Sequence, residues 1–77
     1  MQKIEEIFGT VLRKHRNAQG ISQEAFADKA GIHRTYISAI ELGKVQVSIG
    51  IAQKLAETLE IPLSKLWREV ERLMESD

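Results

Sequence analysis

Two short amphipathic segments joined by a glycine limit the folds open to this chain more than any other feature of its sequence. In the first, after Ser22, the apolar residues are Ala25, Phe26, Ala27 and Ala30. The second spans about His33 to Glu41 and carries two isoleucines three residues apart. Ser22 is a favoured N-cap residue, and Gly31 tolerates the positive φ of a tight turn. The spacing therefore predicts two short helices joined at Gly31.

The rest of the chain is also predicted to be helical. Apolar residues at helical spacing predict a first helix from about Lys3 to Ala18. Ser48 is the expected N-cap of a fourth helix, and Pro62 breaks the chain before a fifth. The stretch "KVQVSI" alternates too briefly for a strand and is expected to be a loop. The prediction is an all-α domain over residues 1–77, with a helix-turn-helix at about 22–42 and helices at about 48–75 completing the core.

Composition narrows the possible functions. The chain has 77 residues, a formal net charge of zero and no cysteine, so neither a disulfide framework nor a thiolate metal site is expected. It contains no apolar run long enough to cross a membrane and no signal peptide, and the expected location is the cytoplasm. No catalytic triad, glycine-rich phosphate loop or metal-ligand set is present. We therefore expect neither an enzyme nor a bound cofactor.

Charge is distributed unevenly in spite of the neutral total. Residues 10–45 carry six cations against three acids, whereas residues 46–77 carry four cations against six acids. The positive excess coincides with residues 30–43 and the stretch that precedes them, and a sign asymmetry of this kind can mark a face for an anionic partner.

The third predicted helix divides into two faces. At 100° per residue, Ile37 and Ile40 fall on one side, with Tyr36 beside them. The opposite arc holds a forked donor, two hydroxyls and a small residue, namely Arg34, Thr35, Ser38 and Ala39. Arginine can bond guanine through two donors, and serine and threonine can bond several bases. This arc therefore suits base edges in a DNA groove.

The segment "SQEAFADKAGIHRTYISAIELG" resembles the helix-turn-helix of the phage lambda repressor/Cro-like (XRE) family of DNA-binding regulators. Within that family, "HRTYIS" is most similar to the small controller proteins of restriction-modification systems. The resemblance implies a transcriptional regulator that binds palindromic operators as a homodimer and controls its own locus. It implies DNA contacts by Gln23, Arg34, Thr35, Tyr36, Ser38 and Lys44.

Individual roles also follow from the resemblance. Arg34, Thr35 and Ser38 would reach bases or nearby phosphates, while Tyr36 would lie at the groove edge or pack at the edge of the core. Gln23 would bind a phosphate or brace the recognition helix, and Lys44 would meet a phosphate.

Four further residues have expected roles. His33 is expected at the N-cap, and Lys14 is a candidate phosphate contact. A structural ion pair between Arg13 and Glu41 is expected from a similar pair in relatives.

The loop after the third helix departs from the family. Leu42, Val45 and Gln46 stand where many relatives carry basic residues or asparagine. Few loop contacts with DNA and modest affinity per monomer are therefore expected, which favours a dimer.

Helix five supplies the expected dimer interface, with Leu66, Trp67 and Val70 as its residues. Double-stranded DNA is the expected partner, RNA polymerase is left open with Glu24 as the candidate contact, and no membrane association is expected. One alternative is an antitoxin or other protein-interaction module that also binds DNA. The operator, the target genes and the sign of control are not readable from the sequence.

Overall fold

The apolar faces of the five predicted helices pack together in one hydrophobic core. The computed structural model describes residues 3–76, which form five α-helices and no strand. These helices are α1 (Ile4–Ala18), α2 (Gln23–Ala30), α3 (Arg34–Glu41), α4 (Ile49–Thr58) and α5 (Leu63–Glu75). The all-α prediction is confirmed, and the predicted helix limits differ from the observed ones by a residue or so at the ends.

Local signals define where the helices begin. The Ser22 hydroxyl accepts a hydrogen bond from the Ala25 N–H at 3.0 Å, and the Ser48 hydroxyl accepts one from the Ile51 N–H at 3.1 Å. Both serines are therefore N-caps, as predicted. Residues 44–48 form the predicted loop between α3 and α4, where Val45 and Val47 pack against the edge of the core.

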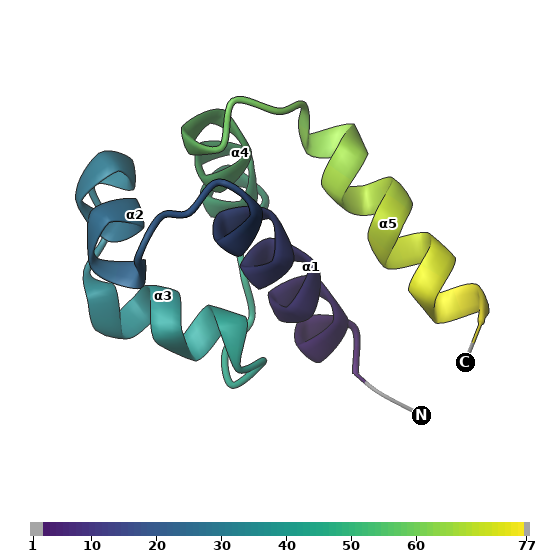
Figure 1. Cartoon of the computed structure of the whole chain (residues 1–77). Coiled ribbons are helices and arrows are strands. Elements are labelled where there is room, and N and C mark those ends of the chain that lie inside the picture. The colour runs from purple at the N-terminus through teal and green to yellow at the C-terminus, as the bar shows by residue number, and fades with distance from the viewer. Residues whose placement is uncertain (1–2, 77) are drawn as a thin grey trace.

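The helices surround α1. It packs against α3 on one side and α5 on the other, while α4 contacts both α2 and α5 (Figure 1). The largest fully buried side chains come from all five helices or their ends: Val11, Leu12, Phe26, Ile37, Ile40, Leu55, Leu59, Leu66 and Val70. No helix in the described part of the chain is long and apolar enough to cross a membrane.

The packing of α5 corrects the prediction that Leu66, Trp67 and Val70 form a dimer interface. Leu66 and Val70 are completely buried within the single chain, so they cannot be the exposed residues of a dimer interface. They lie three and seven residues after Leu63, which itself packs against the core. Trp67 is 39% exposed, and its ring stacks at a tilt on Phe8, with ring centroids 5.8 Å apart. Only Trp67 of the three is available to a partner.

Candidate nucleic-acid interface

The turn between α2 and α3 depends on Gly31. This residue has φ 68° and ψ 33°, a left-handed conformation that costs a side chain roughly 1 kcal/mol or more. The Gly31 N–H donates to the Asp28 carbonyl, and the next N–H, of Ile32, donates to the Ala27 carbonyl at 3.0 Å. These two bonds close the end of α2 and redirect the chain into α3 within three residues.

Helix α3 turns its polar face outward. Ile37 and Ile40 are fully buried against the core, whereas Arg34 and Thr35 are exposed. Ser38 and Ala39 are half-buried on the same outer side. The predicted division of α3 into an apolar and a polar face is therefore confirmed.

The remaining residues implied by the resemblance surround this face. Tyr36 is half-buried and packs against the core edge, and Lys44 is exposed directly after Gly43. Gln23 is half-buried at the start of α2, where its side-chain amide donates to Glu41 Oε1 at 2.9 Å. The structure thus shows Gln23 bonded to the end of α3, and a phosphate contact, the other role considered for Gln23, stays a prediction.

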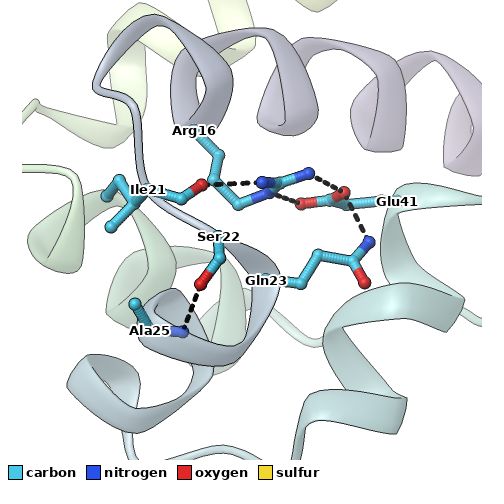
Figure 2. Close-up of polar contacts among 6 residues, drawn as sticks. All are labelled: Arg16, Ile21, Ser22, Gln23, Ala25 and Glu41. Atoms are coloured by element: carbon cyan, nitrogen blue, oxygen red, sulfur yellow. Dashed lines mark hydrogen bonds and ion pairs between the residues drawn. The ribbon is translucent and has the colours of Figure 1, made fainter.

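A buried ion pair holds the ends of three helices together (Figure 2). Arg16 Nε donates to Glu41 Oε2 at 2.7 Å and Arg16 Nη2 to Glu41 Oε1 at 3.0 Å. The third donor, Nη1, reaches the Ile21 carbonyl at 2.7 Å. Both side chains are almost fully buried, at 9% and 2% exposure, and such two-point geometry is the strong form of the interaction. Together with Gln23, it ties α1, the start of α2 and the end of α3.

The expected partner of Glu41 was wrong, because Arg16 and not Arg13 forms the pair. Arg16 follows Leu12 by one helical turn and therefore continues the buried stripe of α1. Arg13 lies about 100° further around the helix from Leu12 and is exposed. Helical spacing places Arg16 on the core side of α1, but only the packing of α1 against α3 brings it to Glu41.

Backbone contacts also hold α3 against α1. A Cβ atom added at Gly9 would lie 2.6 Å from the Glu41 carbonyl oxygen and also overlap that of Ile40. At Gly43 an added Cβ would lie 2.6 Å from the Glu6 Cα atom. At these two glycines the backbone of α1 and the chain at the end of α3 meet without a side chain between them, so the end of α3 has little freedom to shift.

The surface charge of α3 follows from this packing. Glu41 is the one acid of the helix, and its carboxylate is buried and paired with Arg16. The outer face therefore presents hydroxyls and the cation of Arg34, with Lys44 exposed just beyond the C-terminal end. A face of this composition is compatible with close approach of phosphates.

At the start of α3, His33 takes the predicted N-cap position, although its side chain makes no hydrogen bond to the helix backbone. Its Nδ1 atom instead lies 2.9 Å from Thr35 Oγ1. This contact joins two exposed side chains at the N-terminal end of α3, and no pattern in the sequence had indicated it.

Lys14 is engaged elsewhere. Its ammonium lies 3.3 Å from Glu69 Oε1 of α5, and His15 Nε2 lies 2.7 Å from Glu69 Oε2. Partial burial raises the pKa of Glu69, but the hydrogen bonds and charges of His15 and Lys14 outweigh it, so the pKa is lowered overall. Lys14 therefore links α1 to α5, which packs on the side of α1 away from α3 (Figure 1).

Comparison with known proteins identifies the domain. Residues 12–66 match the helix-turn-helix family HTH_3. The chain is 40% identical over 73 residues to control protein C.MunI of a Mycoplasma species, covering 94% of this chain and 99% of that protein. It is 36% identical over 63 residues to control protein C.SmaI of Serratia marcescens, covering 82% and 75% of the two chains.

The fold of this chain is also similar to that of a solved structure. The restriction-modification controller protein C.AhdI of Aeromonas hydrophila is 39% identical and superposes with a TM-score of 0.79, over 80% of this chain and 94% of that chain. The chain therefore belongs to the XRE-type HTH_3 helix-turn-helix family of DNA-binding transcriptional regulators, in which restriction-modification controller proteins are among its relatives.

Proposed function

We propose that this protein is an autoregulatory controller of a restriction-modification system, which binds a palindromic operator as a homodimer. The polar outer face of α3 carries the proposal. The buried pair with Arg16 removes the charge of Glu41, the one acid of α3, from this face and anchors the end of the helix. The similarity to C.MunI and C.AhdI, named as control or controller proteins, supports the restriction-modification assignment.

In this proposal α3 enters the major groove. Arg34 projects from its first turn and bonds guanine through two donors, while Thr35 and Ser38 bond neighbouring base edges. Lys44 contacts a phosphate beyond the end of the helix, and Tyr36 contacts the backbone at the groove edge with the part of its ring that the core leaves exposed. Gln23, at the start of α2, contacts a phosphate in this proposal with the amide hydrogen that is not bonded to Glu41.

The homodimer is proposed to form through an apolar surface formed by α1, the loop after α3, α4 and α5. Ile4, Ile49 and Trp67 are 42%, 80% and 39% exposed, and all three line a groove of about 220 Å³. A neighbouring groove shares Ile4 and Trp67 and adds Met74, which is 46% exposed. Contiguous exposed apolar surface favours association with a partner, which supports the proposed interface.

A second copy of the chain is the occupant that fits this surface. A two-fold dimer buries the same patch on both partners, so a single apolar surface is sufficient. The patch lies on α1, the α3–α4 loop, α4 and α5, and none of its lining residues belongs to α3 itself. Two recognition helices spaced by one turn of DNA, about 34 Å, would match a palindromic site.

Control of transcription also requires RNA polymerase. Glu24 is exposed in the first turn of α2, where a bound polymerase subunit would be able to reach it. We include it as the candidate contact for activation, to be tested by transcription in vitro with a Glu24→Gln variant that still binds the operator.

The principal experiment is an electrophoretic mobility shift assay on the DNA upstream of the protein's own gene. Wild-type protein is expected to shift a specific fragment, and Arg34→Ala to lose specific binding, since one bidentate pair contributes about 1–3 kcal/mol of discrimination. Arg68→Ala is the matched control, because Arg68 is an exposed cation on α5. Specific binding that is unchanged in Arg34→Ala would refute the assignment of α3.

The dimer is tested separately by analytical ultracentrifugation. Ile49→Asp places a charge in the most exposed part of the apolar surface and is expected to give monomers at concentrations where the wild type dimerises. Leu42→Asp is the control, because Leu42 is also exposed, at 55%, but lies at the end of α3. Equal dissociation of the two variants would contradict the proposed surface.

A further inference from the structure

The inference begins with the hydrogen bond between His33 and Thr35. Nδ1 of His33 and Oγ1 of Thr35 are 2.9 Å apart, and both side chains are exposed at the start of α3. The histidine ring does not cap the backbone of the helix. Its one hydrogen bond within the described part of the chain is therefore directed at a residue that the proposed function places against DNA bases.

The electrostatics of the helix end favour one direction for this bond. The first N–H groups of a helix, here those of Arg34 and Thr35, have no partner within the helix, and the helix dipole makes this end electropositive. Near these positively polarised N–H groups, an Nδ1 atom that carries a lone pair is favoured over an Nδ1 atom that carries a hydrogen. In the neutral ring Nδ1 then accepts, Nε2 carries the hydrogen, and the Thr35 hydroxyl donates to His33.

Donation to His33 changes what Thr35 offers to DNA. A hydroxyl has a single hydrogen and two lone pairs, so a threonine that donates to histidine presents only lone pairs to a base. In the major groove the complementary groups are the amino groups of adenine and cytosine, whereas guanine and thymine present acceptors. An oxygen that can only accept would face another acceptor at those two bases.

We propose that His33 is a positioning residue for base recognition, which orients the Thr35 hydroxyl as an acceptor and thereby selects adenine or cytosine at the base that Thr35 meets. The inference rests on the proposed function, since it assumes that α3 lies in the major groove. It assigns to His33 a role in specificity without direct contact with the base.

The test compares base preference rather than overall affinity. Each base of one half-site is replaced in turn, and relative affinities are measured by competition for wild type, His33→Asn and Thr35→Val. The position where Thr35→Val alters the preference identifies the base that Thr35 meets. At that position His33→Asn is expected to reduce the preference for adenine or cytosine by about threefold to tenfold, the size of one neutral hydrogen bond.

Asparagine is chosen because it is among the best N-cap residues, so the start of α3 is preserved, as far-UV circular dichroism will verify. The double variant separates a positioning role from a structural one. If His33 acts through the hydroxyl, His33→Asn has no further effect on base preference in the Thr35→Val background, and Thr35→Ser keeps the preference.

Two outcomes are distinguishable. Wild-type protein that binds the operator specifically, with a base preference unchanged by His33→Asn, would overturn the role of His33 alone. Absence of specific binding by the wild type would overturn the proposed function itself.

Discussion

Replacing either Arg16 or Glu41 by methionine would leave one buried charge without its partner. Methionine is close in length to both side chains and carries no charge, so the change removes the ion pair with little loss of volume. Because the two side chains are 9% and 2% exposed, water cannot readily solvate the remaining charge. Removal of one partner from such a pair costs about 3–5 kcal/mol.

That cost is large for a chain of 77 residues. At roughly 0.05–0.15 kcal/mol per residue, its total stability is on the order of 4–12 kcal/mol. In a domain of this size each kcal/mol lowers the melting temperature by about 4–8 °C. Each single variant is therefore expected to melt at least about 12 °C below the wild type.

The double variant Arg16→Met/Glu41→Met is expected to be more stable than either single variant. With both charges removed, no buried ion remains without a partner, and apolar replacement of a buried pair is often nearly neutral. The Ile21 carbonyl and the Gln23 amide would lose their bonds to the pair. Both residues are half-buried and thus partly accessible to water, so the cost of each unsatisfied group should lie at the low end of about 1–3 kcal/mol.

Urea unfolding followed by far-UV circular dichroism measures all three free energies, and Arg13→Met serves as the exposed control. The control should stay within about 0.5 kcal/mol of the wild type. Single variants that cost less than about 1 kcal/mol, or single effects that simply add in the double variant, would show that the pair does not hold the three helix ends together.

Three further predictions concern other parts of the fold. Gly9→Ala should destabilise the protein by about 1–2 kcal/mol, because overlap with the α3 backbone outweighs the gain in helix propensity; an unchanged thermal melt would contradict this close approach. Glu60→Gly should raise stability by about 0.5–1 kcal/mol, because Glu60 has φ 60° and glycine relieves the left-handed strain; a lower melting temperature would argue against strain at this position. The pKa of Glu69 is lowered in the folded state, so its stabilising effect is present above the unfolded pKa of about 4.3 and lost as pH falls through the folded value. Unfolding free energies measured between about pH 3 and 6 should therefore fall less steeply in Glu69→Gln than in the wild type, and identical pH profiles would exclude this contribution.

Much of the fold was readable from the sequence because helix formation is a local process. The N-caps at Ser22 and Ser48, the turn at Gly31 and the two faces of α3 depend on residues within about one helical turn of each other. Spacing alone therefore predicted the exposure of Arg34 and Thr35.

The ion pairs between helices were harder to predict from the sequence. A charged residue pairs with whatever group the packing of distant elements brings near it, so Glu41 pairs with Arg16 from 25 residues earlier and not with Arg13. The allocation of apolar surface depends on packing in the same way, since helical spacing marks Leu66, Trp67 and Val70 as apolar but does not say which of them the core will bury.

The sequence by itself determined the five helices, the turn and the polar face that the helix-turn-helix presents, since these depend on periodicity and capping. Tertiary structure decided which arginine anchors α3, how closely Gly9 lets α1 approach, and that only Trp67 of the three expected interface residues stays available to a partner. The physical reason is that burial and ion pairing are set by the distances between elements far apart in the chain, which local spacing does not encode.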